Sequence, residues 1–316
     1  MTALVTVTPN PSVDRTLHVQ RLVPGVLNRA TSPPCIEPSG KGINVALAAH
    51  AAGHGATAVF PCGGRTGEEL LELLAGTGLP CTAVPISGSV RANISVVGAD
   101  GETTKINEPG PALSSSEVSA LVEASLLPGP GWLAWCGRLP AGFSPADLAS
   151  AVERARAAGR RVAVDTSGAA LAGVLPAQPD LLKPNATELA ELTGRPLHTV
   201  GDVAAAAEAL VRRGVGAVLV SLGADGALLA EAEGVWHGTA PVRRVVNTVG
   251  AGDALLAGYL IAAGLHSSAA DRLATALRWG ATAVAHAGTL VSRPDPAIDV
   301  HLHPLDAGRS LTEPII

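Results

Sequence analysis

Apolar residues along the chain form short β-branched runs and longer runs with helical spacing. The short runs predict strands at residues 3–8, 56–61, 132–136, 161–165, 180–183 and 216–221. The longer runs predict helices at 42–52, 66–76, 116–126, 145–158, 186–193, 202–214, 251–263 and 268–287. This alternation predicts right-handed βαβ units, and so an α/β fold with a mostly parallel sheet covered on both faces. In such sheets, ligands bind at the carboxyl ends of the strands.

Two stretches interrupt this alternation. Residues 13–36 hold short alternating pieces broken by Pro24, Pro33 and Pro34, and residues 90–107, VRANISVVGADGETTKIN, have the pattern of a hairpin that turns at Asp100 and Gly101. Neither stretch fits a βαβ unit. Together they predict a small β-sheet that projects from a single domain spanning 1–316 and could act as a lid.

The tail at 292–316 is rich in proline and has no helical period, which predicts an irregular segment. His301 and His303 in this tail could bind a metal ion. Two exposed histidines on an irregular tail are more often incidental, so we expect no metal site there.

Composition narrows the class of protein. Apolar residues make up 47% of the chain and charged residues 16%, which predicts a folded globular protein. The net charge of −5 and the 2% aromatic content disfavour a nucleic-acid-binding protein. The cysteines form no CxxC pair, no secretory signal is visible, and the most apolar helix is too short to cross a membrane. We therefore expect a cytoplasmic protein with free thiols and no membrane partner.

Two common nucleotide-binding motifs are absent. Lys41 lies in PSGKGIN, which lacks the spacing of a GxxxxGK[ST] loop, and no GxGxxG follows the first strand. A P-loop enzyme or a dinucleotide-dependent dehydrogenase is therefore disfavoured.

The stretch 245–260, VVNTVGAGDALLAGYL, places an acid behind two glycines at the start of an apolar helix. A glycine turn that leads into a helix directs backbone N–H groups and the positive end of the helix dipole at one point, which favours an anion. Asp253 could then be a base that takes a proton beside this anion hole during phosphoryl transfer. It could equally be an acid that complements the helix dipole.

Several other polar residues have both a functional and a structural interpretation. Lys41 lies between glycines before a helix that contains Asn44, and Arg91 and Asn93 share one face of the predicted hairpin strand. Arginine suits phosphate recognition, yet each of these residues could also be an ordinary surface or turn residue. The same holds for Asp14, which is either a turn residue or an acceptor for a hydroxyl group.

The stretch 181–194, LLKPNATELAELTG, also permits two interpretations. Asn185 and Glu188 have the spacing of a helix cap, and they could instead hold a hydrated magnesium ion at the ligand edge of the sheet. In VLVSLGADGALL, at 218–229, Ser221 and Gly223 either form the turn between two strands or leave backbone open to a nucleotide.

Taken in order, these motifs resemble the ribokinase-like carbohydrate kinases over about residues 2–290. NTVGAGDALLAG is similar to the C-terminal signature of that family, and SGKGINVA to its N-terminal signature. NPSVDRT, INEPGP, DTSGAAL and VSLGADGALL resemble the phosphosugar branch, particularly the 1-phosphofructokinases. Tagatose-6-phosphate kinases and the minor 6-phosphofructokinases are close relatives in that branch.

The resemblance implies a three-layer α/β sandwich with a projecting β-lid that is often shared in a homodimer. It implies that Asp253 is the general base, with an anion hole formed by Gly250, Ala251 and Gly252. The residues implied to hold the phosphosugar are Asp14, Ser39, Gly40, Lys41, Asn44, Arg91 and Asn93. Those implied to lie around ATP and Mg²⁺ are Lys183, Asn185, Glu188, Ser221, Gly223 and Gly226.

Two positions depart from the family pattern. The usual G-G-K-G is here Ser39-Gly40-Lys41-Gly42, and the usual G-S-L-P-P-G is here GRLPAG at 137–142. Arg138 thus replaces a small serine near the expected substrate phosphate. The sequence predicts an ATP- and Mg²⁺-dependent kinase of a ketohexose phosphate, most simply fructose 1-phosphate. A non-catalytic sugar-phosphate-binding regulator on the same scaffold is the alternative.

Overall fold

A computed structural model describes residues 4–127, 129, 131–286 and 293–312. Its main sheet contains β1 (Leu4–Val7), β4 (Ala56–Cys62), β5 (Cys81–Pro85), β8 (Trp132–Cys136), β9 (Arg161–Asp165), β10 (Leu181–Leu182), β11 (Ala217–Ser221), β12 (Ala227–Glu231), β13 (Gly234–Thr239) and β14 (His301–His303). The strand order is β14-β13-β12-β11-β10-β9-β8-β1-β4-β5. Neighbours from β11 to β5 are parallel, and β12, β13 and β14 extend the other edge with antiparallel pairs.

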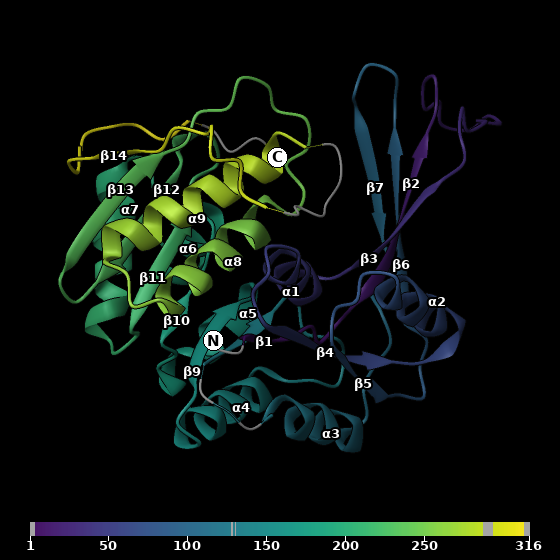
Figure 1. Ribbon diagram of the computed structural model, residues 1–316, viewed down its shortest axis with the longest axis horizontal. Helices are drawn as coiled ribbons and strands as arrows, with labels where there is room; N and C mark the ends of the chain where they lie inside the picture. The colour runs from purple at the N-terminus through teal and green to yellow at the C-terminus, as the bar shows by residue number, and fades with distance from the viewer. Residues whose placement is uncertain (1–3, 128, 130, 287–292, 313–316) are drawn as a thin grey trace.

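Helices cover both faces of this sheet (Figure 1). One apolar layer includes α1 (Lys41–Ala51), α2 (Gly64–Ala75), α8 (Ala251–Gly264) and α9 (Ala269–Val284). The opposite layer includes α3 (Ser115–Ser125), α4 (Pro145–Ala157), α5 (Gly168–Gly173), α6 (Ala186–Thr193) and α7 (Val200–Arg212). The predicted three-layer α/β sandwich is therefore confirmed.

Local sequence explains where many of these helices begin. A side chain that accepts the third backbone N–H, with an acid that reaches back, forms a capping box. This arrangement starts α3, α4, α6 and α7, at Ser114, Ser144, Asn185 and Thr199 respectively. Helix α8 differs, because it begins at a glycine without a side-chain cap. Most of α8 is buried, since it packs between α1 and α9, so its apolar residues surround the helix instead of forming one stripe.

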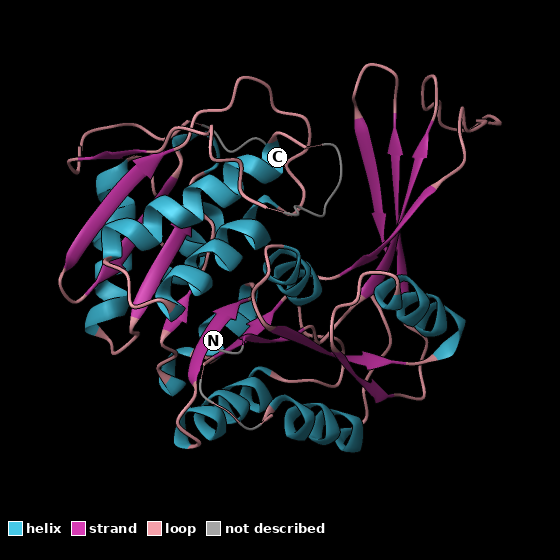
Figure 2. Cartoon of the chain, viewed as in Figure 1, coloured by secondary structure: helices cyan, strands magenta, loops and turns pink. Residues whose placement is uncertain are grey.

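The second sheet is small and consists of β2 (Ser12–His18), β3 (Cys35–Ser39), β6 (Arg91–Val97) and β7 (Thr103–Asn107), in the order β3-β2-β6-β7. It extends away from the helix-covered body (Figure 2). The predicted hairpin at 90–107 is confirmed as β6 and β7, and its turn contains Gly101 with φ of +87°. The interrupted stretch 13–36 contributes β2 and the start of β3, so the small sheet arises where βαβ alternation fails.

Among the described residues, the predictions from sequence missed β5, α5, β13, β14 and the 3₁₀ helix Leu175–Ala177. The prediction of an irregular tail was wrong at residues 301–303, where β14 pairs with β13. This strand is short, and two of its three residues are exposed, so it leaves no apolar run in the sequence. His303 Nε2 lies 2.9 Å from Thr239 Oγ1, which gives it a structural partner. Residues 3, 287, 292 and 313–316, which fall in predicted segments, lie outside the described residues.

Two expectations from composition can be compared with the structure. The four cysteines are free thiols, with Cys136 buried and Cys35 and Cys81 exposed. Within the described ranges, every helix is too short or too polar to span a bilayer.

Candidate active site

The parallel strands bring polar residues to one edge of the main sheet. Asp165 is the last residue of β9, Ser221 is the last residue of β11, and Lys183 directly follows β10. Arg138 follows β8 by two residues. The first turns of α1 and α8 belong to the same site, because Lys41 pairs with Asp165 and Lys183 lies beside Gly252. The carboxyl edge therefore collects residues from across the chain, as a parallel sheet predicts.

Asp253 lies in the first turn of α8 and is only 7% exposed. Its Oδ2 accepts a hydrogen bond of 2.8 Å from Asn44 Nδ2 in α1. Burial, with the nearby negative charge of Asp165, raises the pKa of Asp253 to about 6 from its ordinary value of 3.8. A carboxyl group with such a pKa can accept a proton at neutral pH and hold it more firmly than an exposed aspartate.

The turn before Asp253 has the geometry of an anion site. Gly250 caps α8 with φ of +81°, a left-handed conformation that favours glycine. The first amide to donate to a carbonyl of this helix is Ala254 N, which lies 2.8 Å from Gly250 O. The amides of Ala251 and Gly252 belong to the first turn, where helix N–H groups have no partner inside the helix, and Ala251 N makes only a long hydrogen bond of 3.4 Å to Thr248 O, outside it.

A buried carboxylate between two lysines lies beside this turn. Lys41 Nζ is 2.7 Å from Asp165 Oδ1, Lys183 Nζ is 3.1 Å from Asp165 Oδ2, and Asp165 is fully buried. Burial alone would raise the pKa of Asp165, but the two ammonium groups outweigh it, so this pKa is lowered. A Cβ on Gly252 would lie 3.5 Å from Lys183 Nζ, so one of the paired cations borders the glycine turn.

Neighbouring charges also determine the protonation state of Lys41. Burial acts to lower its pKa, but the carboxylates of Asp165, Asp253 and Glu188 together raise it. Lys41 is therefore a permanent cation at this edge. Sequence reasoning placed Lys183 near the nucleotide and left Asp165 out of the site. The available signal was an acid that ends the apolar strand RVAVD at the ligand edge.

The small sheet contributes a second group of polar residues. Asp14 in β2 accepts hydrogen bonds of 2.8 Å from Ser12 Oγ, 2.8 Å from Ser39 Oγ and 2.9 Å from Asn93 Nδ2. Gly40, which follows Ser39, has φ of +132°, and a Cβ there would lie 2.5 Å from Thr8 Cγ2. Close packing on Thr8 thus requires this glycine and fixes the chain just before Lys41.

Two arginines lie near each other beside this group. Arg91 donates hydrogen bonds to the carbonyls of Asn10 and Glu108, at 3.2 and 3.0 Å. Burial lowers the pKa of Arg91, and the positive charge of Arg138 acts in the same direction. Arg138 is exposed and has no hydrogen bond or ion pair with any described residue. Arg138 is therefore close enough for its charge to act on Arg91, and it forms no ion pair within the described part of the chain.

Some buried polar atoms of these residues have no protein partner. Among the described residues, Asn44 Oδ1, Asn93 Oδ1 and Arg91 Nε are buried without a hydrogen bond. Folded proteins satisfy most such atoms, so exceptions among the expected site residues require an explanation. These three come from α1 and the small sheet, and their donor and acceptor character matches a polyhydroxylated ligand.

The residues expected around a nucleotide lie along β10 and β11. The capping box of α6 is present, with Glu188 N 2.8 Å from Asn185 Oδ1 and Asn185 N 2.9 Å from Glu188 Oε2. A bridge pairs Asn185 with Ser221. Gly223 has φ of +60° and open space beside it, whereas a Cβ on Gly226 would overlap Gly238 O. Packing thus explains Gly226, and Gly223 leaves backbone accessible.

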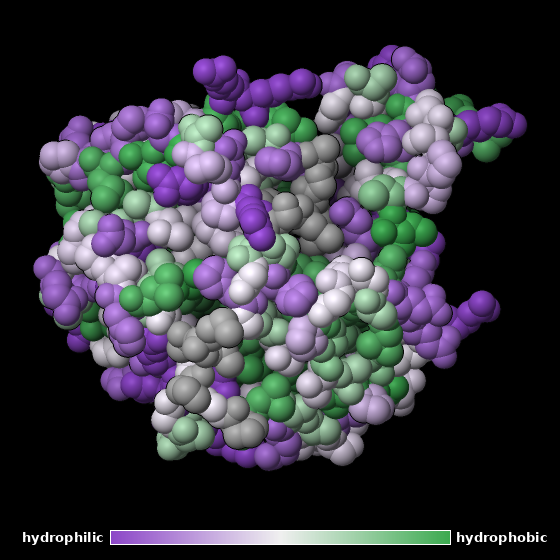
Figure 3. Space-filling view, viewed as in Figure 1, coloured by the Kyte–Doolittle hydropathy of each residue, from purple (hydrophilic) through white to green (hydrophobic). Residues whose placement is uncertain are grey.

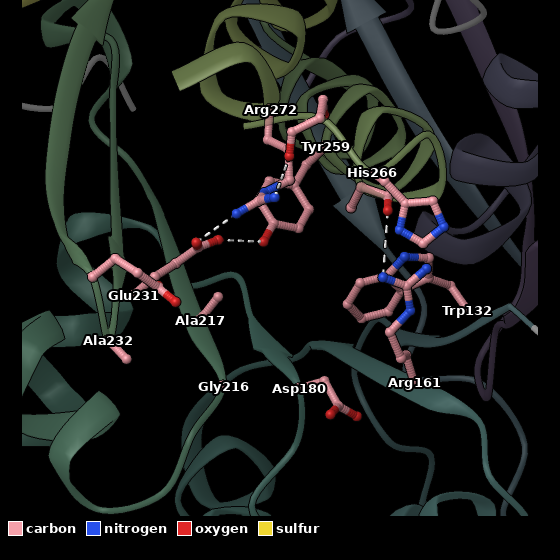
Figure 4. A pocket seen from close by; sticks show the side chains of 13 residues that line it. Trp132, Arg161, Asp180, Gly216, Ala217, Glu231, Ala232, Tyr259, His266 and Arg272 are labelled. Atoms are coloured by element: carbon pink, nitrogen blue, oxygen red, sulfur yellow. Dashed lines mark hydrogen bonds and ion pairs between the residues drawn. The ribbon is translucent and has the colours of Figure 1, made fainter. Parts of the chain in front are cut away.

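A separate cavity of about 450 Å³ lies at the opposite edge of the sheet (Figure 4). Its lining includes Trp132 and Arg161, the first residues of β8 and β9. Several charged groups there are already paired, because Glu231 contacts both Arg272 and Tyr259, and the Arg161 guanidinium lies 4.6 Å from the centre of the Trp132 ring. The cavity therefore lies at the amino ends of β8 and β9, opposite the edge where Asp165 ends β9 and Arg138 follows β8.

The sandwich, its small sheet and the glycine-led helix with a buried acid place the protein in the ribokinase-like class of α/β kinases. The sequence model described as pfkB family carbohydrate kinase matches residues 8–296, and the chain belongs to this family. The resemblance seen in the sequence is thereby confirmed.

Relatives agree with this assignment. The chain is 41% identical over 290 residues to a 1-phosphofructokinase of Haloferax volcanii, covering 91% of this chain and 93% of the relative. It is 34% identical to phosphofructokinase-2 from Escherichia coli, solved in complex with fructose-6-phosphate, with a TM-score of 0.86 and coverage of 90% and 94%. The tetrameric inhibited form of that enzyme gives 36% identity, a TM-score of 0.84 and coverage of 90% and 93%.

The pKa of Asp253 predicts how activity depends on pH. Because burial raises this pKa to about 6, a base at this position becomes protonated as the pH falls through 6. We expect kcat for sugar phosphorylation to be constant from about pH 7 to 8 and to fall about tenfold per pH unit below about pH 6. The measurement is kcat at saturating substrates between pH 5 and 8. A profile without an acid limb above pH 5 would contradict a base with this pKa.

Proposed function

We propose that the protein transfers the γ-phosphoryl group of ATP to a ketohexose phosphate, with fructose 1-phosphate as substrate and fructose 1,6-bisphosphate as product. The observation that carries this proposal is Asp253, a buried base with a raised pKa at the glycine-led start of α8. Family membership supports ATP as the phosphoryl donor. The name of the H. volcanii relative supports fructose 1-phosphate over other sugars.

The proposed chemistry is an in-line displacement. Asp253 takes the proton from the sugar 6-hydroxyl as its O–H bond breaks, and that oxygen forms a bond to the γ-phosphorus. The bond from this phosphorus to the bridging oxygen breaks, and ADP leaves. The amides of Gly250, Ala251 and Gly252, with Lys183, oppose the negative charge that develops on the transferred group.

The charges and hydrogen bonds of the site assign the remaining residues. We propose that Asp14, Asn44 and Asn93 bind sugar hydroxyls, because Asn44 and Asn93 keep unpartnered oxygens and Asp14 collects three donors. The proposed phosphosugar residues also include Ser39, Gly40, Lys41, Arg91 and Arg138. The proposed nucleotide residues are Lys183, Asn185, Ser221, Gly223 and Gly226.

Magnesium is the remaining expected component. The Asn185–Glu188 capping box uses only Oε2 of Glu188, so Oε1 is left for a hydrated ion, and magnesium prefers such oxygen ligands with few direct protein contacts. We propose that Glu188 and Asn185 hold Mg²⁺ through water. When bound, the ion would neutralise charge on the phosphates.

A coupled ADP-release assay with a panel of phosphosugars tests the function. We expect the highest kcat/KM with fructose 1-phosphate, and lower values with fructose 6-phosphate and tagatose 6-phosphate. A higher kcat/KM with one of the 6-phosphates would support the kinase function but show that fructose 1-phosphate is not the preferred substrate. Binding of a phosphosugar without ADP release in the presence of ATP and Mg²⁺ would favour the sugar-binding regulator instead.

Replacing the proposed base tests the mechanism. Asp253→Asn should lower kcat by about 10²–10⁴ while nucleotide and sugar still bind, because an amide accepts no proton. The variant should be at least as stable as the wild type at pH 7. A raised native pKa means that ionising Asp253 costs stability as the pH rises from about 4 to 6.

The control is Asp271→Asn, which alters an acid in the first turn of α9, where the carboxylate accepts a hydrogen bond from Ser268 and from no other residue that the structure describes. It should retain wild-type kcat. Near wild-type kcat in Asp253→Asn would remove Asp253 from the mechanism.

Arg138 is proposed to join Lys41 and Arg91 around the phosphate already present on the sugar. A phosphomonoester carries about −1.5 to −2 charges at neutral pH and can use more than one cation. Arg138→Ser, which restores the residue usual in the family, should lower kcat/KM for the phosphosugar roughly ten- to 150-fold, the loss of one charge-assisted contact. KM for ATP should stay nearly constant.

Arg138→Lys provides the matched control, since it keeps the charge and loses the planar guanidinium. Its sugar KM should lie between those of wild type and Arg138→Ser. An unchanged sugar KM and kcat in Arg138→Ser would make Arg138 an ordinary surface residue.

We propose that the small sheet is a lid over the sugar and the contact surface of a homodimer. It carries Asp14, Arg91 and Asn93, and its edge strand β7 is exposed at every residue. Large apolar side chains in or near it are exposed, namely Leu22, Val23, Val26, Leu27 and Ile106. Figure 3 shows apolar and polar side chains mixed over this part of the surface. A second copy of the chain could cover them.

Amide exchange tests the lid, because closure should protect its backbone. Saturating sugar phosphate should slow exchange in both 13–36 and 90–107, and unchanged exchange in both would contradict closure.

Sedimentation tests the proposed homodimer. The dimer requires twice the chain mass of 31.5 kDa, and Ile106→Lys should weaken the association. A monomer at micromolar concentration would exclude a stable dimer.

A further inference from the structure

The turn that links β11 to β12 contains a buried carboxylate. Residues 222–226 form a short 3₁₀ helix, Gly223–Asp225, closed by hydrogen bonds from Asp225 N to Leu222 O and from Leu222 N to Gly226 O. Asp225 is 3% exposed, whereas Gly223 and Ala224 are exposed on the other side of the turn. A buried carboxylate costs folding free energy unless hydrogen-bond donors surround it.

Those donors come from the far end of the chain. Thr312 N lies 2.6 Å from Asp225 Oδ2, Thr312 Oγ1 lies 3.1 Å from Oδ1, and Arg309 Nη2 lies 3.2 Å from Oδ1. Within the described ranges, every hydrogen bond to this carboxylate comes from these two residues. Residues 307–312 therefore form a strap behind the turn, joined to it through Asp225.

The other side of the strap is anchored to the first turn of α7 and to the residue before its cap. Val200 N donates to Arg309 O at 2.9 Å, Gly201 N donates to Ala307 O at 3.2 Å, and Leu311 N donates to His198 O at 2.8 Å. Gly201 has no side chain to block this approach, since a Cβ there would lie 2.6 Å from Ala307 O. The strap is thus held on a regular helix and can fix the position of the turn.

We propose that the strap 307–312 holds the turn 222–226 in the conformation that binds ATP, and that Arg309 is a positioning residue for this binding. The inference rests on the proposed function, in which Ser221 and Gly223 contact the nucleotide. Gly223 leaves its open side to a ligand, while Asp225, two residues later, is tied from behind. The strap acts on nucleotide affinity alone, because it has no contact with the Asp253 cluster or the small sheet among the described residues.

The expected size of the effect follows from population arithmetic. The apparent affinity for a ligand falls in proportion to the fraction of protein in the binding-competent conformation. Losing one charge-assisted hydrogen bond to the turn would lower that fraction. The remaining bonds from Thr312 would still hold part of the population.

The central experiment measures Arg309→Leu with both substrates varied. KM for ATP should rise about three- to 30-fold, while kcat and the sugar KM stay within about twofold of wild type. Arg309→Lys should recover part of the ATP affinity. Thr312→Val, which removes one hydroxyl donor and keeps the backbone N–H, should raise KM for ATP less than Arg309→Leu does.

Arg212→Leu is the matched control. Arg212 pairs with Glu208 at 3.7 Å on the exposed surface of α7, so its loss also removes an arginine–carboxylate pair. It should leave all kinetic constants unchanged. Equal losses in kcat and in both KM values for Arg309→Leu would indicate a general folding defect and overturn the proposal.

Gly223→Val separates this inference from the function on which it rests. Gly223 has φ of +60°, so a valine there should strain the turn as well as obstruct the nucleotide on its open side, and both effects should raise KM for ATP if the nucleotide binds at this turn. If Gly223→Val raises that KM and Arg309→Leu does not, the strap has no positioning role, and the proposed nucleotide site stands. If neither variant changes KM for ATP, the nucleotide does not contact this turn, and both the assignment and the strap's role fall.

Discussion

The ion pairs of Asp165 with two lysines are the interaction on which the site depends. Asp165 is fully buried at the end of β9, and it holds Lys41 from α1 and Lys183 from the segment after β10. Removing the carboxylate would leave two cations close together beside the glycine turn of α8, while removing both lysines would leave an uncompensated buried charge. The same carboxylate helps to raise the pKa of Asp253, so one residue both fixes the cations and tunes the base. The end of a core strand therefore determines both the positions of the two lysines and the basicity of Asp253.

The parallel sheet makes this clustering possible at low cost. Parallel strands end side by side, so polar residues placed after buried apolar runs meet without polar groups entering the core. β8 and β9 show the asymmetry, since Trp132 and Arg161 begin these strands at the cavity edge while Cys136 and Asp165 end them at the site. The small sheet then provides side chains, including Asp14 and Asn93, that no βαβ unit supplies. Where alternation breaks in the sequence, the fold supplies a polar surface facing the site.

Much of this could be predicted from the sequence, because the decisive patterns are local. Alternating strands and helices predicted the sandwich, the hairpin signal at 90–107 predicted β6 and β7, and the glycines around Asp253 predicted a helix-terminal anion site. The partners of buried charged residues were harder to predict from the sequence. Asp165 was missed because an acid at the end of a strand has an ordinary local explanation, and its two lysines are 124 and 18 residues away. The strap was missed for the same reason, since Asp225 meets Arg309 and Thr312 only through tertiary structure. Asn185 and Glu188 show a further limit, because the cap that they form is compatible with both interpretations of their sequence.

The distribution of aromatic rings has a practical consequence for optical experiments. Trp132, Trp135, Trp236 and Trp279 all lie on β8, β13 or α9, and the single tyrosine lies on α8. The segments that form the small sheet contain no tryptophan, tyrosine or phenylalanine. Intrinsic fluorescence will therefore come from rings in the sandwich, with no emitter in the small sheet. A tryptophan placed in β7 would be the single indole in that sheet, so the difference in emission between this variant and the wild type, whose four tryptophans lie in the sandwich, would report on the small sheet.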